Sequence, residues 1–180
     1  MKRGSALKRS AITRKPPKPK KRPANPCAWS SRCKARPRIE VTAEERYCLS
    51  HGCKVADIAV GSWVKHVRDR VCLFCGTDRD LEWAHIRSRG AHRSLRWHVG
   101  LSRYTGSSTW TDPGNSIALC RGHHFMFTRA PARWDKWVEM NWPGLYTRLV
   151  HLEIENEGKR VEPDIGQIIR EFRARLAEAA

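Results

Sequence analysis

Hydrophobic residues along the chain recur mostly at intervals of three and four, the spacing of an amphipathic helix. Residues 54–71 show this spacing first, and we predict a helix there that leads into Cys72. Residues 131–142 repeat tryptophans at helical spacing, between a proline suited to a first helical turn and the helix-ending pair Pro143-Gly144. Two further helices are predicted in residues 145–155 and after Pro163-Asp164.

Two short segments have the character of strands. Residues 81–86, "LEWAHI", mix apolar and polar positions, and residues 116–119, "SIAL", form an apolar run after the turn-forming "TDPG". Residues 121–129, "RGHHFMFTR", predict a helix directly after the second strand. The expected fold class is therefore α+β, with a small core of two strands and a helix and with flanking C-terminal helices.

The cysteines are arranged for metal binding rather than for disulfides. There are seven, an odd number, and most lie in pairs near histidines. Cys72 and Cys75 form a C-x2-C pair followed by Gly76, which suits a turn with positive φ, and Cys120 with His123 forms a second pair. Three thiolates and one imidazole predict a structural, tetrahedral Zn²⁺ site. Because protein ligands fill all four positions, we do not expect this zinc to be catalytic.

Residues 27–53 contain a second candidate metal site. Cys27, Cys33, Cys48 and His51 form two ligand pairs separated by an insert of hairpin length, which would gather them around a second zinc. A polar segment this small needs such a cross-link to fold. Cys53 is an alternative fourth ligand to His51, and reduced, partly buried cysteines without metal are the alternative to zinc.

The charge of the chain indicates a polyanionic partner. Lysine and arginine number 35 against 18 acidic residues, a formal net charge of +17. Residues 1–26 are basic and proline-rich with no acidic residue, so we predict a disordered arm that binds phosphates. Nucleic acid is favoured over a membrane because no apolar run approaches the roughly 20 residues that span a bilayer. With no secretory signal recognisable, a cytoplasmic location is expected, in a bacterium or a phage-infected host.

Three polar residues lie within the central cysteine arrangement without a role in holding zinc. His85 comes near the end of the first predicted strand, and Asn115 immediately precedes the second. His124 follows the ligand His123 but points about 100° further round the helix. The three are expected to converge, and His85 is our candidate for a catalytic base.

Residues 72–128, with the motif "CxxCG…AHI…N…LCxxHH", resemble the HNH endonucleases, ββα-metal nucleases whose fold is held by a zinc knuckle. Residues 27–71 resemble the cysteine-rich lead-in of HNH proteins from phages and prophages. The resemblance implies that His85 activates water against a DNA phosphodiester, double-stranded DNA being the expected substrate. Asn115 would bind the catalytic ion or order the loop that holds His85, and His124 would be a metal ligand or a phosphate donor. Mg²⁺ is the usual ion of the family, but an imidazole-rich site accepts Mn²⁺, Ni²⁺ or Zn²⁺ as well.

The sequence departs from the family at one position. Many members carry an acidic residue or a histidine as metal ligand directly before the general base, where this chain has Ala84. Asp112 is a candidate substitute, although Asp-Pro-Gly is also a common turn. The missing ligand supports an alternative function, a non-catalytic, zinc-dependent nucleic-acid-binding protein on the same scaffold. An RNA-directed nuclease is a third hypothesis.

The long segment between His85 and Asn115 is rich in arginine, which favours contacts to phosphates beside the cut bond. The candidate nucleic-acid-binding residues are Arg87, Arg89, Arg93, Arg96 and Arg103. The predicted organisation is a basic arm (1–26), a zinc-binding segment (27–53), a nuclease core with its lead-in helix (54–130) and a C-terminal helical region (131–180). The oligomeric state is not predicted.

Overall fold

Two small antiparallel hairpins and five helices make up the computed structural model, which describes residues 27–30, 32–87, 95–100, 112–156 and 163–180. The order is β1 (Ile39–Glu40), β2 (Arg46–Tyr47), α1 (Leu49–Trp63), the π-helix η1 (Val64–Arg68), β3 (Leu81–His85), β4 (Ser116–Cys120), α2 (Arg121–Arg129), α3 (Pro131–Asn141), α4 (Leu145–Asn156) and α5 (Ile165–Ala177). The α+β class is confirmed. The predicted basic arm lies outside the described residues.

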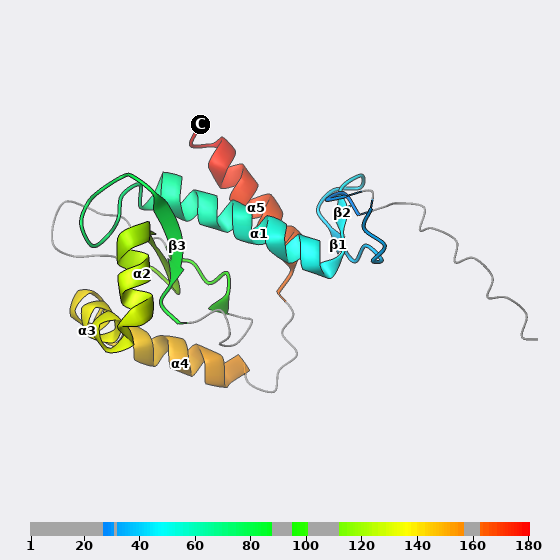
Figure 1. Ribbon diagram of the computed structural model, residues 1–180. Helices are drawn as coiled ribbons and strands as arrows, with labels where there is room; N and C mark the ends of the chain where they lie inside the picture. Colours follow the sequence, from blue (N-terminus) through cyan, green and yellow to red (C-terminus); the bar gives the residue numbers. More distant parts are fainter. Residues whose placement is uncertain (1–26, 31, 88–94, 101–111, 157–162) are drawn as a thin grey trace, which may run out of the picture.

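The N-terminal β1–β2 segment and the β3–β4–α2 region lie at opposite ends of α1, and α5 packs along α1 between them (Figure 1). The hairpin β1–β2 packs on α1 and α5 through a buried cluster that includes Val41, Tyr47, Val55 and Ile169. A second cluster joins Val60 and Trp63 of α1 to Trp83 of β3 and Phe172 of α5. Helix α5 therefore packs against α1, and not against α3 and α4, which precede it in the chain.

The core hairpin pairs β3 with β4 in antiparallel register, from Leu81 opposite Cys120 to His85 opposite Ser116. The whole of β4 up to Leu119 is buried, as expected for a strand covered on both faces. One face contributes Ile117 and Leu119 to a cluster with Phe127 of α2, Trp134 and Val138 of α3, and Leu145 and Leu149 of α4. This packing sets α2 across the hairpin and places α3 and α4 below it (Figure 1).

The predicted helices and strands are confirmed, except that the lead-in helix ends at Arg68 instead of residue 71 and starts earlier than predicted. The lead-in helix begins at Leu49 rather than near residue 54, so His51 lies in its first turn. Gly52 permits this arrangement, because a Cβ there would lie 2.9 Å from Cγ1 of Ile39 in β1. Among the described residues, no helix is long and apolar enough to cross a membrane. The predicted division into domains stays a prediction.

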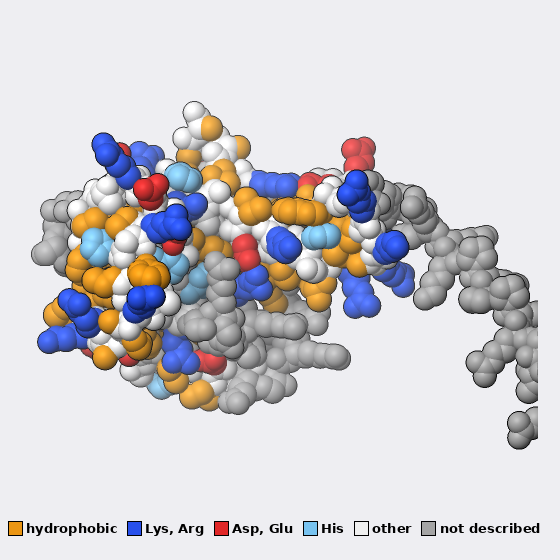
Figure 2. All heavy atoms as spheres, viewed as in Figure 1, with side chains coloured by type: hydrophobic (Ala, Val, Ile, Leu, Met, Phe, Trp, Pro, Cys, Tyr) orange, Lys and Arg blue, Asp and Glu red, His pale blue; other side chains and the backbone are white. Residues whose placement is uncertain are grey.

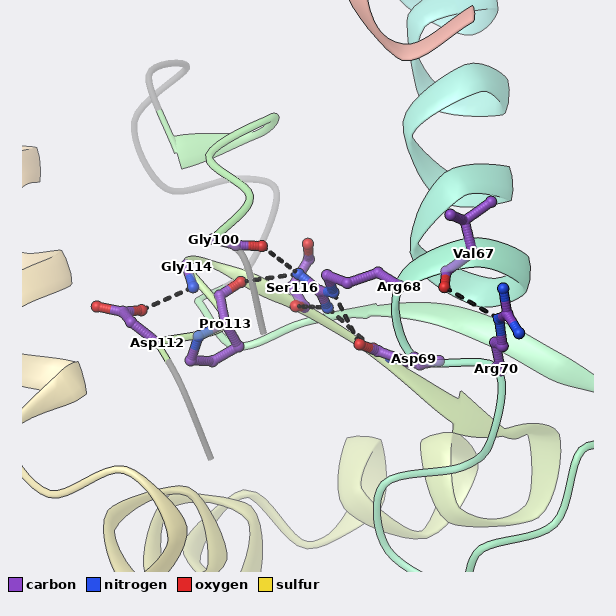
Figure 3. A network of polar contacts seen from close by, with 10 residues as sticks. Val67, Arg68, Asp69, Arg70, Gly100, Asp112, Pro113, Gly114 and Ser116 are labelled. Carbon is purple, nitrogen blue, oxygen red and sulfur yellow. Dashed lines mark hydrogen bonds and ion pairs between the residues drawn. The ribbon is translucent and has the colours of Figure 1, made fainter. Parts of the chain in front are cut away.

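The end of α1 widens into the π-helix η1, and this change directs a buried arginine into the core. The Arg68 guanidinium donates to both carboxylate oxygens of Asp69, at 2.7 and 2.9 Å, and to the carbonyl oxygens of Gly100, Pro113 and Ser116 (Figure 3). Asp69 in turn accepts from the backbone N–H of Ala118. This buried network ties the lead-in helix to β4 and to the turn before Asn115.

Candidate active site

The four predicted ligands of the core zinc lie together, and we call Cys72, Cys75, Cys120 and His123 the core metal cluster. Their ligand atoms all lie within 4.8 Å of one another. The Sγ atoms of Cys75 and Cys120 are 4.0 Å apart, and Nδ1 of His123 lies 3.7 Å from Sγ of Cys72. Thiolates bound about 2.3 Å from a tetrahedral zinc would lie about 3.8 Å apart, so the donor set fits this ion. Gly76 has the positive φ (75°) expected of it.

The second predicted set also converges, and we call Cys27, Cys33, Cys48 and His51 the N-terminal metal cluster. The Sγ atoms of Cys33 and Cys48 are 3.7 Å apart, and Nδ1 of His51 lies 3.3 Å from Sγ of both Cys27 and Cys48. His51 rather than Cys53 completes this set of four. Helix α1 contributes that fourth donor because its first turn follows Cys48 directly.

One thiol in each cluster has a lowered pKa. Burial opposes ionisation of Cys72, but backbone N–H groups of Cys120, Cys75 and Phe74 outweigh it and lower the pKa of that thiol. At Cys27 burial is again outweighed, here by the N–H groups of Cys48 and Trp29, and the pKa falls to about 7. Since thiolates and not thiols bind zinc, these contacts favour the ligand form of Cys72 and Cys27.

His85 is the last residue of β3, and a contact with the loop that follows sets the orientation of its ring. Its Nε2 lies 3.2 Å from the carbonyl oxygen of Arg96, and its ring packs 4.3 Å from that of Trp83. A carbonyl only accepts hydrogen bonds, so Nε2 must carry the proton in this contact. In the neutral imidazole the lone pair is then on Nδ1, the atom that would act as a base.

Asn115 is fully buried, and its amide connects the two ends of the long loop. Its Oδ1 accepts from the N–H of Arg87 at 2.7 Å, while Nδ2 donates to the carbonyl oxygens of Arg87 (3.2 Å) and Leu95 (2.9 Å). The backbone N–H of Ile86 also donates to the carbonyl oxygen of Asn115. These contacts hold the chain immediately after His85 against the start of β4.

His124 is held from β3 by a carboxylate that sequence reasoning missed. Its Nδ1 lies 2.7 Å from Oε2 of Glu82. Alternation along a strand puts Glu82 on the same face as Ala84, but the sequence gives no signal that this face meets His124. His123, the preceding residue, points to the core metal cluster, so the two adjacent histidines contact different groups.

His85 and His124 meet at a cavity of about 200 Å³ between β3, α2 and the start of α3. The side chains that line it are those of Ala84, His85, Ile86, Leu119, His124, Phe127, Thr128, Pro131 and Trp134. Asn115 is not among them. The carbonyl oxygen of Ile86, at the cavity edge, accepts from Nε1 of Trp134 (3.1 Å) and from the Tyr146 hydroxyl (3.3 Å), so α3 and α4 also support the segment after His85.

Both described arginines of the candidate set are engaged in ion pairs. Arg96 makes a bidentate contact with Asp57 of α1, at 3.0 and 2.5 Å, and this contact raises its pKa. Arg87 pairs with Glu153 of α4 at 2.6 Å. Arg89, Arg93 and Arg103 lie outside the described residues. Asp112 accepts from the N–H of Gly114 (2.8 Å) and pairs with Arg148 (3.2 Å), as expected of a turn residue.

Comparison with protein-family models found a match in the central part of the chain. Residues 72–130 match the model of an HNH endonuclease family. Comparison with curated proteins and with solved structures found no match. The matched segment begins at the first ligand of the core metal cluster and includes β3, β4 and α2, and with them His85, Asn115 and His124. Over these residues the chain is therefore similar to the HNH endonucleases.

Proposed function

We propose that this chain is a metal-dependent endonuclease that hydrolyses DNA phosphodiester bonds with His85 as general base. The observation that carries the proposal is that His85 and His124, two residues of the matched segment from different elements, line one cavity. They are also held in opposite ways, His85 through Nε2 and His124 through Nδ1. One imidazole is thereby suited to proton transfer and the other to ligation.

In the proposed reaction, Nδ1 of His85 takes a proton from the water that attacks phosphorus. The resulting imidazolium keeps its Nε2–H donated to the carbonyl oxygen of Arg96, so the ring holds its orientation through the step. A divalent ion, Mg²⁺ by preference, would supply charge stabilisation for the phosphate and the leaving oxygen. His124 would contribute a ligand to that ion. Asn115 would act as a positioning residue, since its amide already bonds the loop beside His85.

The nucleic-acid surface proposed for this site includes the exposed face of α2. Arg121, Phe125 and Arg129 lie four residues apart along this face, and the Arg129 guanidinium stacks 4.3 Å from the centre of the Phe125 ring. Thr128 of the same helix lines the cavity. On the side of the molecule seen in Figure 2, Lys and Arg side chains lie over both ends and acidic side chains are few. Such a surface suits phosphates on either side of the cut bond.

Plasmid nicking tests the proposal. With Mg²⁺ or Mn²⁺ the wild-type chain should convert supercoiled DNA to nicked or linear forms, and His85→Ala should slow the reaction by about 10²- to 10⁴-fold. His66→Ala, an exposed histidine on η1, is the matched control and should cut normally. Chelator should stop the reaction while zinc analysis verifies that the structural sites stay loaded. Parallel assays on single-stranded DNA and RNA determine the preferred substrate.

The rival hypothesis, a non-catalytic nucleic-acid-binding protein, is favoured by one observation. The cavity wall contributed by β3 at Ala84 is apolar, and Ala84 is only 2% exposed. If the wild-type chain binds DNA but does not cut it with Mg²⁺, Mn²⁺, Ni²⁺ or Zn²⁺, the rival is correct and the nuclease proposal is lost.

A further inference from the structure

Glu82 lies beside the candidate active site without lining its cavity. It shares one face of β3 with Ala84, and the two pair with Leu119 and Ile117 of β4. Because α2 starts directly after β4, this face of the hairpin lies beneath the first turns of the helix. A further bond from the N–H of Arg121 to the carbonyl oxygen of Asp80, at 3.0 Å, holds the helix start against the chain before β3.

The contact between Glu82 and His124 is short and local to this junction. Oε2 of Glu82 lies 2.7 Å from Nδ1 of His124, and the two side chains are 41% and 36% exposed. The other carboxylate oxygen, Oε1, lies 4.0 Å from Nε of Arg121, whose side chain is 83% exposed. His124 is therefore the main partner of this carboxylate among the residues that the structure describes.

The direction of this hydrogen bond determines the tautomer of His124. An ionised carboxylate has no proton to give, so Nδ1 of His124 donates. In the neutral ring the lone pair must then be on Nε2, the nitrogen remote from Glu82. Metal-bound histidines in proteins commonly have this arrangement, with a carboxylate on one ring nitrogen and the ion on the other.

We propose that Glu82 is a positioning residue that holds His124 as the Nδ1–H tautomer and so prepares Nε2 to bind the divalent ion of the reaction. The ion-binding part of this inference rests on the proposed function. Glu82 would also supply a negative charge on the face of β3 that it shares with the apolar Ala84. It acts through His124 and does not itself touch the substrate.

The tautomer is measured first, without metal and without substrate. Nitrogen-15 NMR of histidine-labelled, zinc-loaded protein at about pH 8, where free imidazole is neutral, distinguishes a protonated Nδ1 from a protonated Nε2. His124 of the wild-type chain should be protonated on Nδ1. In Glu82→Ala this preference should be lost, and in Glu82→Gln it should be weakened but retained, because the amide oxygen still accepts. Asp78→Asn, an exposed acid of the segment before β3, should leave His124 unchanged.

Metal affinity is the second measurement. Calorimetric titration of the zinc-loaded chain with Mn²⁺ should show about 10- to 100-fold weaker binding in Glu82→Ala, the range expected for loss of a supporting partner. His124→Ala should remove binding, and Asp78→Asn should retain it. The inference is overturned if His124 has the same tautomer in wild type and Glu82→Ala. It is equally overturned if Glu82→Ala and His124→Ala abolish binding alike with the tautomer unchanged, since Glu82 would then be a direct ligand.

These results are independent of the nicking assay. A tautomer that depends on Glu82, with weaker Mn²⁺ binding in the variant, supports the inference even if no DNA is cut. Nicking that depends on His85 but not on Glu82, with an unchanged tautomer, would leave the endonuclease proposal intact and remove this one.

Discussion

The N-terminal and core metal clusters use the same ligand types, three cysteines and one histidine, but they close loops of very different length. Cys33 and Cys48 are 15 positions apart and enclose only the β1–β2 hairpin. Cys75 and Cys120 are 45 positions apart and enclose His85 and Asn115. The comparison shows how one kind of cross-link can stabilise a small segment in one place and organise a candidate active site in another.

The two regions also differ in what supports them besides metal. The core has the Arg68–Asp69 pair, whose side chains are 2% and 1% exposed. The N-terminal segment is joined to α5 by the pair Arg173–Glu45, whose side chains are 44% and 26% exposed. Buried pairs cost several kcal/mol when one partner is removed, whereas exposed pairs contribute little. We therefore expect the same type of substitution to have unequal effects in the two regions.

The largest difference should come from the metal ligands. Cys72→Ser should remove one of two zinc ions, unfold the β3–β4–α2 core and abolish nicking. Cys72 is both a member of the core metal cluster and only 1% exposed, within the hydrophobic core that contains Ile117 and Leu119. Binding free energies of structural zinc, about 10–16 kcal/mol, match or exceed the whole stability of a typical domain, about 5–15 kcal/mol. Zinc content, circular dichroism and nicking measure the three effects.

Cys48→Ser is the counterpart in the N-terminal cluster. It should also remove one zinc ion, but most nicking should remain, since α1 is additionally held by the core hairpin and α5. Cys53→Ser, outside both clusters, is the control and should retain two zinc ions. Equal loss of activity in Cys48→Ser and Cys72→Ser would contradict the division of roles described above.

The buried ion pair should have the next largest effect. Asp69→Asn leaves the Arg68 guanidinium buried without its carboxylate and should lower the free energy of unfolding by about 3–5 kcal/mol. Urea unfolding of the zinc-loaded protein measures this change. Arg70→Gln is the neighbouring control, because Arg70 is exposed and, among the residues that the structure describes, its side chain bonds the carbonyl oxygen of Val67 alone. Equal unfolding midpoints for Asp69→Asn and wild type would show that the network is not structural.

The exposed pair should have the smallest effect, and one that depends on pH. The Arg173 guanidinium, helped by the Tyr47 hydroxyl, lowers the pKa of Glu45 below its ordinary 4.5. Folding then favours the ionised form, so the stabilisation is present above pH 4.5 and is lost as pH falls through the lowered pKa. Glu45→Gln should cost about 0.2–1 kcal/mol at neutral pH and nothing once pH is below the lowered pKa. Urea midpoints of both zinc-loaded proteins at pH 7 and pH 6 test this. The same small difference is expected at both, since both lie above pH 4.5, and a difference that grows with acidity would contradict the assignment.

Local spacing in the sequence predicted most of the fold and much of the candidate site. The C-x2-C and C-x2-H pairs, the two strands and the helices all depend on residues within a few positions of each other, where geometry follows directly from the order of the residues. The family match at residues 72–130 bears out the HNH resemblance. The roles of His85, Asn115 and His124 stay predictions, now supported by their contacts.

Apart from the two sets of metal ligands, contacts between distant segments were decided only by the tertiary structure. Glu82 meets His124 because β3 pairs with β4 in one register and α2 then returns over the same face. Arg87 and Arg96 look like phosphate ligands in the sequence, yet they pair with Glu153 and Asp57. The side-chain partners of an ionisable group depend on which elements pack together, and that packing results from the burial of apolar faces along the whole chain. Residue spacing alone carries no information about those partners.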